Sequence, residues 1–208
     1  MKLSVSILSI ENRLEYVKKL NNTNTDYIHI DVMDGIFVRD RQFSLEEIKK
    51  INEVSKKKLD IHLMMENPLT YIDKLDNMNI NNITIHIEIA KDINYLIDKI
   101  HSLGYKVRLS ISPDTSIECL IPYLDKVEGI LVMSVNPGKG GQSFIPSTLD
   151  KAKKLKELNN NLSIEIDGGV NDTNIEAIKD SGVDTIVVGS YIVKSNDYVD
   201  RINNLISV

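Results

Sequence analysis

Short runs of β-branched and aliphatic residues alternate along the chain with longer amphipathic segments. The runs lie at 3–9, 27–33, 59–65, 83–88, 106–112, 129–135, 163–168 and 185–190. In the segments between them apolar residues recur every three or four positions, as in 44–57, 68–79, 92–104 and 173–182. The runs predict strands and the segments predict helices, and the spacing of roughly 22 to 34 residues is that of a strand–loop–helix unit.

Eight such units in 208 residues predict a single domain, 1–208, with an α/β fold. The expected architecture is a compact (β/α)8 TIM barrel. A doubly wound open sheet is the alternative. It is disfavoured because no G-x-G-x-x-G fingerprint follows any predicted strand.

Composition narrows the function classes. The chain is 42% hydrophobic and 26% charged, with a net charge of -5, which is typical of a soluble globular protein. We expect no nucleic acid and no membrane as partner. Cys119 is the single cysteine, so no disulfide can form within the chain, and the first residues do not resemble a signal peptide. A cytoplasmic protein is therefore expected.

Polar residues gather where the predicted strands end. His29 and Asp31 end the second run, His62 lies in the third, and Asp167 ends the seventh. All four can face the barrel interior, because side chains alternate between the two faces of a strand. Two buried carboxylates together are costly unless a cation neutralises them. A two-His, two-Asp set predicts one divalent metal per subunit, zinc first, with iron, manganese or cobalt as competitors.

The two remaining strand-end candidates and the last histidine are less specific. His86 and Glu88 are explained as well by an ordinary buried pair as by support behind the metal ligands. His101 falls in a predicted helix, where an exposed position is expected.

Three late loops are rich in glycine: 136–142, 167–170 and 187–190. Glycines that follow strands leave backbone N–H groups free to bind phosphate, and the loops after the last strands are the usual phosphate site of this barrel. Together they predict a phosphorylated ligand.

The stretches SILS, HIDVMDGIFV, LDIHLMMENP, MSVNPGKGGQSFIP, EIDGGV and GVDTIVVGS occur in this order from Ser6 to Ser190. The ordered set resembles the ribulose-phosphate 3-epimerase family. The resemblance implies a ribulose-phosphate-binding barrel, with a metal held by His29, Asp31, His62 and Asp167. It further implies that Asp31 and Asp167 are the catalytic acid and base on opposite faces of the sugar.

The resemblance also assigns substrate contacts and a cap of methionines over the reacting carbons. The implied substrate-binding residues are Ser6, His62, Gly138, Lys139, Gly140, Gly141, Asp167, Gly168, Gly169, Gly189 and Ser190. The implied cap is Met33, Met64 and Met133, although methionine is more often core filler. The implied reaction is C3 epimerisation of D-ribulose 5-phosphate to D-xylulose 5-phosphate by a homo-oligomer.

The chain departs from the family pattern at four places. Val5 replaces a proline, the stretch 36–40 differs after the second run, and SISPDTS follows the fifth run where an LNP-T pattern is usual. Lys139 replaces an aromatic residue in the glycine loop, where it either reaches the phosphate or points to solvent. None of these changes touches the proposed ligands, but they bear on substrate preference.

Three alternatives stay open at this point. An allulose 6-phosphate 3-epimerase would use the same residues on a longer sugar. A metal-dependent phosphosugar hydrolase or a non-catalytic phosphosugar-binding barrel belongs to another class. A further class, barrels that decarboxylate or condense sugar phosphates, is disfavoured. Those barrels carry a D-x-K-x-x-D motif, and here His62 stands where the motif has its lysine, two residues past Asp60.

Overall fold

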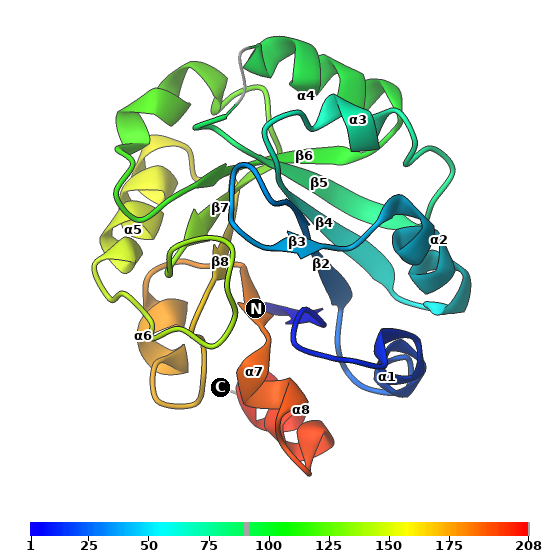
Figure 1. The fold of residues 1–208 in the computed structure, drawn as a ribbon. Coiled ribbons are helices and arrows are strands. Elements are labelled where there is room, and N and C mark those ends of the chain that lie inside the picture. Colours follow the sequence, from blue (N-terminus) through cyan, green and yellow to red (C-terminus); the bar gives the residue numbers. More distant parts are fainter. Residues whose placement is uncertain (90–91, 208) are drawn as a thin grey trace.

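We describe a computed structural model in which residues 1–89 and 92–207 are placed; the predicted domain, 1–208, also includes residues 90, 91 and 208, which lie outside these ranges. Eight parallel strands close into a barrel, with the helices outside it (Figure 1). The barrel strands are β1 (Lys2–Ser6), β2 (Tyr27–Asp34), β4 (Lys58–Met64), β5 (Ile80–His86), β6 (Lys106–Ile111), β7 (Gly129–Met133), β8 (Ser163–Asp167) and β9 (Thr185–Val188).

Closure of the barrel comes from β1, which pairs in parallel with both β2 and β9. The (β/α)8 prediction is therefore confirmed. A two-residue strand that the sequence did not indicate, β3 (Arg41–Gln42), pairs antiparallel with the end of β2. It belongs to the loop that crosses in front of the barrel in Figure 1.

The helices follow the predicted amphipathic segments, with two differences. They are α1 (Arg13–Leu20), α2 (Leu45–Val54), α3 (Leu69–Ile72), α4 (Ile93–Ser102), η1 (Ile117–Tyr123), α5 (Thr148–Leu158), α6 (Ile175–Asp180), α7 (Ser190–Val193) and α8 (Tyr198–Ile206). The segment predicted as helical at 68–79 forms only the single turn α3. The connection between β6 and β7 is the 3-10 helix η1, which contains Pro122. Proline lacks the N–H of a regular helix.

Capping side chains mark the beginning of two of these helices. Ser44 accepts a hydrogen bond from the Glu47 N–H at the start of α2, and Asp92 does the same for the Tyr95 N–H at the start of α4. Each cap satisfies a backbone donor that has no partner within the helix.

The alternation of side chains along β2 divides the interior of the molecule in two. Ile28, Ile30 and Val32 are fully buried in the main hydrophobic cluster, which lies between the barrel and the helices. His29 and Asp31 have the opposite parity and point into the barrel, where they are 0% and 4% exposed. The strand is therefore apolar on its helix-facing side and polar on its inner side.

Candidate active site and metal centre

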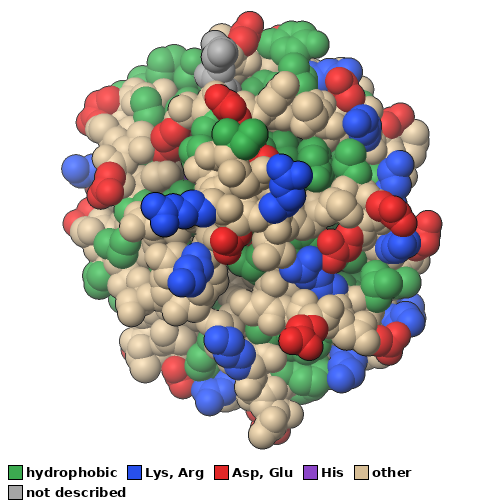
Figure 2. Space-filling model, in the orientation of Figure 1, with side chains coloured by type: hydrophobic (Ala, Val, Ile, Leu, Met, Phe, Trp, Pro, Cys, Tyr) green, Lys and Arg blue, Asp and Glu red, His purple; other side chains and the backbone are tan. Residues whose placement is uncertain are grey.

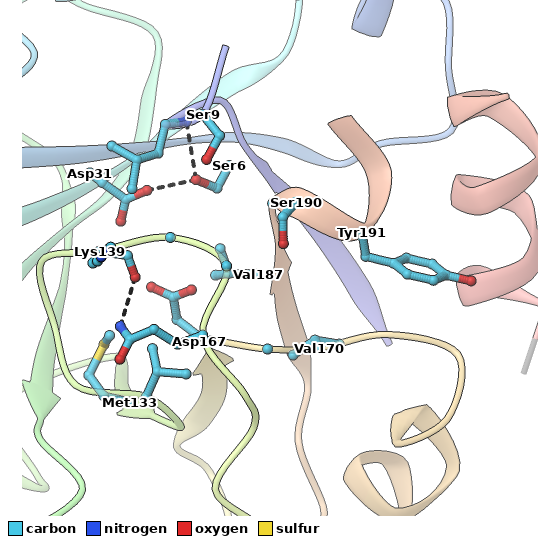
Figure 3. A pocket seen from close by; sticks show the side chains of 18 of the residues that line it. Ser6, Ser9, Asp31, Met133, Lys139, Asp167, Val170, Val187, Ser190 and Tyr191 are labelled. Carbon is cyan, nitrogen blue, oxygen red and sulfur yellow. Dashed lines mark hydrogen bonds between the residues drawn. The ribbon is translucent and has the colours of Figure 1, made fainter. Parts of the chain in front are cut away.

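Strand register brings the predicted polar residues to one level of the barrel. Asp31 lies opposite His62 across the β2–β4 pair, and Ser6 lies opposite His29 across the β1–β2 pair. Asp167, at the end of β8, lies opposite Met133 of β7. In Figure 3 Asp31 and Asp167 extend from strands on different sides of the pocket, and their carboxylates point toward one another.

The four predicted ligands form one tight cluster. His29 Nε2 is 3.2 Å from Asp31 Oδ1 and 3.8 Å from Asp167 Oδ2. His62 Nδ1 is 3.6 Å and 3.8 Å from the same two carboxylate oxygens. Ligand atoms placed about 2 Å from a tetrahedral ion are about 3.3 Å apart. These separations therefore suit four atoms around a single cation.

Two imidazole nitrogens support this interpretation. His29 Nε2 and His62 Nδ1 are buried and have no hydrogen-bond partner among the described residues. A buried polar atom without a partner is costly, and it is rare in folded proteins. Because both atoms face the two carboxylates, the cluster His29, Asp31, His62 and Asp167 could hold a metal ion.

In the metal-free cluster, burial and neighbouring charges shift the pKa values of the two aspartates in opposite directions. Burial favours the neutral form of Asp31, but the adjacent His29 outweighs it and holds the pKa of that carboxyl well below its ordinary value. Burial, together with the charge of Asp31, raises the pKa of Asp167 to about 7. Near neutral pH one carboxylate is thus ionised while the other still binds a proton part of the time. A bound cation would lower both pKa values.

The pKa values of the two histidines shift in opposite directions, although both side chains are buried. Burial lowers the pKa of His62 to about 4, which leaves a neutral imidazole able to bind a metal. Burial also disfavours the charged form of His29, but Asp31 and Asp60 raise its pKa well above the ordinary value. A cation between the ligands would replace the proton on His29 Nε2.

Below the cluster lies a polar network that sequence reasoning missed. Asp60 accepts hydrogen bonds from Ser4 Oγ at 2.7 Å and from Asn82 Nδ2 at 2.6 Å, and its Oδ2 lies 2.8 Å from His29 Nδ1. Asp60 and His62 lie two residues apart on β4, so their side chains face the same side of the strand. This alternation is the sequence signal that could have identified Asp60 as an interior residue. The network holds His29 from beneath, so that its other nitrogen faces the metal site.

A cavity of about 450 Å³ opens above the cluster at the mouth of the barrel. Met33, Met64 and Met133 line it, as do Asp31 and Asp167. The other predicted contact residues that line it are Ser6, Gly138, Lys139, Gly140, Gly141, Gly168, Gly169, Gly189 and Ser190. His29 and His62 do not line the cavity and lie at its base, where they are 0% exposed. Lining residues that sequence reasoning missed include Ser9, Gln142, Thr173 and Lys194.

Glycine is required at the turn after β8 on steric grounds. Gly168 has φ +121°, and a Cβ there would be 2.4 Å from Cγ2 of Val135. Gly169 has φ +68°, and its Cβ would be 2.5 Å from the backbone N of Phe144. Any other residue would be strained at both positions, so this turn packs directly against the loop after β7.

The loop after β7 presents unused backbone donors to the cavity. Within the described chain, the N–H groups of residues 138–141 donate no hydrogen bond to another protein atom. Gln142 Nε2 instead closes the loop on itself by donating to the carbonyls of Asn136 and Lys139. Figure 2 shows lysine and arginine side chains around this face, with no histidine visible among the described residues.

Comparison with known sequences decides the family. Residues 2–193 match the family described as "Ribulose-phosphate 3 epimerase family". The chain belongs to the ribulose-phosphate 3-epimerase family. A Helicobacter pylori (strain J99) protein named ribulose-phosphate 3-epimerase is 37% identical over 202 residues, covering 95% of this chain and 93% of that protein. The cytoplasmic isoform of the rice enzyme is 34% identical, covering 92% and 86%.

Solved structures that resemble this epimerase-family chain confirm the barrel. One is described as KGPDC from Streptococcus mutans, with a TM-score of 0.77 at 13% identity, covering 99% of this chain and 95% of that one. Another is the 3-hexulose-6-phosphate synthase of Salmonella typhimurium, with a TM-score of 0.74 at 14% identity, covering 99% and 96%. At such identities the likeness concerns the fold alone.

Two further observations complete the description. His101 lies in α4 and is exposed as predicted, with Glu128 Oε2 3.2 Å from its Nε2. No helix within the described ranges has the length and apolar character needed to span a membrane.

Proposed function

We propose that the protein is a metal-dependent ribulose-phosphate 3-epimerase that interconverts D-ribulose 5-phosphate and D-xylulose 5-phosphate. The observation that carries the proposal is the pair Asp31 and Asp167, which line one cavity with two partnerless imidazole nitrogens beside them. Family membership supports the same reaction, because the curated relatives bear that enzyme's name.

The chemistry requires a proton to leave C3 on one face of the sugar and another to arrive on the opposite face. In the proposed mechanism Asp31 removes the proton from D-ribulose 5-phosphate, and Asp167 donates one to the other face. The roles exchange in the reverse direction. In the metal-free cluster the pKa values of the two carboxyls already differ in the direction that this assignment of base and acid requires.

The same cluster would hold the cation, for which zinc is our first expectation. His29, Asp31, His62 and Asp167 would be its ligands, and the ion would act as a Lewis acid for the negative charge that develops on the enediolate oxygens. Met33, Met64 and Met133 would cover the reacting carbons and exclude water.

The phosphate would bind at the glycine loops. The free N–H groups of residues 138–141 supply donors at one edge of the cavity, and Gly189 with Ser190 lines the neighbouring edge. Ser6 donates to Asp31 Oδ2 at 2.7 Å and lies under Gly189, so it joins the phosphate end to the catalytic end.

Isotope exchange tests the reaction directly. In deuterated water, two-base catalysis requires the product to carry solvent deuterium at C3 after essentially every turnover. Product that retains the original C3 hydrogen contradicts the mechanism. Parallel assays with allulose 6-phosphate, and for phosphate release, separate the hexulose epimerase and the hydrolase from the pentulose epimerase.

Substitutions test the two aspartates. Asp31→Asn and Asp167→Asn should each fold and lose activity by about 10³-fold or more, because each removes a proton-transferring group and a metal ligand. Asp98→Asn, at an exposed position on α4, is the matched control and should retain full activity. Full activity in either active-site variant excludes that residue from its role, and activity after complete metal removal excludes the metal.

A further inference from the structure

A chain of hydrogen-bonded side chains leads from the metal cluster to the edge of the barrel. His62 Nε2 is 2.9 Å from His86 Nε2, and His86 Nδ1 is 3.0 Å from Glu88 Oε2. The two imidazole rings are nearly parallel, with an interplanar angle of 19° and centroids 5.0 Å apart. His86 is fully buried, with the Phe37 ring 4.7 Å away, so its nitrogens depend on these two partners.

The far end of this chain is also fixed. Glu88 Oε1 accepts a hydrogen bond from the Ser112 N–H at 2.7 Å, at the end of β6. The carboxylate is thereby anchored, and its second oxygen is left for His86. Interaction with His86 and with the Ser112 N–H outweighs burial and lowers the pKa of Glu88 to about 2, so this group is an acceptor only.

These partners determine the position of each proton along the chain. An ionised carboxylate can only accept, so Glu88 requires the proton of His86 on Nδ1. With its proton on Nδ1, the His86 ring has its lone pair on Nε2 and accepts there from His62. The proton of His62 is therefore on Nε2, and its Nδ1 carries a lone pair.

We propose that Glu88 and His86 are positioning residues that set the tautomer of His62 and so present its Nδ1 lone pair to the metal. His62 Nδ1 is the buried atom without a partner that faces Asp31 and Asp167. The inference rests on the metal site of the proposed function, and neither Glu88 nor His86 is assigned as a ligand or as a proton donor to substrate.

The second imidazole shows why a relay is needed at His62 alone. His29 offers Nε2 to the cluster and places Nδ1 beside Asp60, so one carboxylate fixes its tautomer directly. His62 is turned the other way and offers Nδ1. Its Nε2 contacts His86, whose Nε2 can either donate or accept a hydrogen bond. The contact of His86 Nδ1 with Glu88 determines that His86 Nε2 accepts.

Glu88→Gln is a sharp test because Ser112 restricts how glutamine can bind. The amide oxygen must remain on the Ser112 N–H, which places the amide NH₂ against His86 Nδ1. Nδ1 must then accept, His86 donates from Nε2, and His62 is forced to carry its proton on Nδ1. That proton occupies the atom required by the metal.

Glu128→Gln is the matched control. Glu128 Oε2 also accepts from a backbone N–H, that of Val107 at 2.7 Å, and lies 3.2 Å from a histidine, His101. This pair lies on the outside of the barrel and has no link to the metal cluster. The substitution removes a carboxylate that contacts a histidine and a backbone N–H, but without the relay, because one oxygen of Glu128 contacts both partners.

Two measurements are made on the metal-free protein and its variants. Two-bond ¹H–¹⁵N correlation spectra at about pH 8 report which nitrogen of His62 bears the proton, and the chain has only four histidines to assign. Zinc affinity is then obtained by competition with a chromophoric chelator. We expect the Nε2–H form of His62 in the unsubstituted protein and the Nδ1–H form in Glu88→Gln. Zinc binding should be about 10- to 100-fold weaker in Glu88→Gln and within about twofold of normal in the control.

The outcomes separate this inference from the proposed function. A dominant Nδ1–H tautomer of His62 in the unsubstituted metal-free protein overturns the inference. This measurement does not depend on the folding of any variant. Unchanged zinc affinity in a folded Glu88→Gln variant overturns it as well. If the unsubstituted protein binds no metal while His62 shows the Nε2–H form, the metal-dependent function fails but the tautomer assignment stands.

Discussion

Replacing Asp167 with asparagine should stabilise the metal-free protein, and increasingly so as the pH rises. Asp167 is 16% exposed in its side chain, and burial beside Asp31 raises its pKa from 3.8 to about 7. The folded state therefore holds a proton that the unfolded chain releases near pH 4. For a carboxyl whose pKa is raised on folding, stability is present at low pH and is lost as the pH rises through the folded-state pKa.

The size of the effect follows from that shift. Between about pH 5 and pH 7 the unfolded chain has lost the proton and the folded chain retains it, so the free energy of unfolding falls by about 1.4 kcal/mol per pH unit. The loss over this interval is about 2 kcal/mol, because the folded carboxyl is itself half ionised at its pKa, and it levels off above pH 7. Asparagine has nearly the same shape and does not titrate, so Asp167→Asn escapes this loss.

Urea unfolding in the presence of a chelator, at about pH 5 and about pH 8.5, provides the assay. Other titrating groups are common to both proteins and largely cancel in the difference. The advantage of Asp167→Asn should grow by about 2 to 3 kcal/mol between the two pH values. Zinc at about 100 times its dissociation constant should return about 2.7 kcal/mol to the unsubstituted protein alone. A difference that does not vary with pH, or one that favours aspartate at high pH, would refute the reasoning.

Three further changes test other parts of the site. Gly168→Ala should lower the free energy of unfolding by about 2 to 4 kcal/mol, because it adds a Cβ 2.4 Å from a valine methyl at positive φ. Gly104→Ala, at φ +80° with open space around it, should cost only about 1 kcal/mol, and equal losses in thermal or urea unfolding would contradict the packing argument. Lys139→Gln should raise KM by about 3- to 10-fold at unchanged kcat, because Lys139 lines the cavity within the loop proposed to bind the phosphate. Lys154→Gln at an exposed position on α5 is the control, and an unchanged KM in Lys139→Gln would place the Lys139 ammonium in solvent. Asp60→Asn should weaken zinc binding about tenfold or more in chelator competition, because it removes the acceptor that orients the His29 ring.

The sequence was informative wherever a local rule determined the structure. Alternation along β2 placed His29 and Asp31 on the inner face, and the glycine-rich stretches marked loops that line the cavity. The spacing of the runs predicted eight strands, because each strand–helix unit has a characteristic length. These features depend on short stretches of chain, so a single sequence is enough to recognise them.

Features that depend on several strands at once were out of reach. The sequence does not single out Asp60, because its role requires Ser4 and His29 to lie beside it, which only barrel closure brings about. The relay through His86 was undecided because no pattern tells which nitrogen of an imidazole faces which neighbour. On the sequence alone, the departures at 36–40 bear on substrate preference. None of those residues lines the cavity, although Val38 packs against Met33 and Met64.

The surroundings of Asp60 differ from those that a D-x-K-x-x-D motif would give it. That motif would place lysine where this chain has His62. Here Asp60 has one oxygen shared by Ser4 and His29 and the other held by Asn82. Both oxygens face the barrel interior, so Asp60 does not line the cavity and is not available to a substrate. Because its carboxylate is committed to His29, Asp60 would support the proposed metal ligands, and the proposed proton transfers would be left to Asp31 and Asp167.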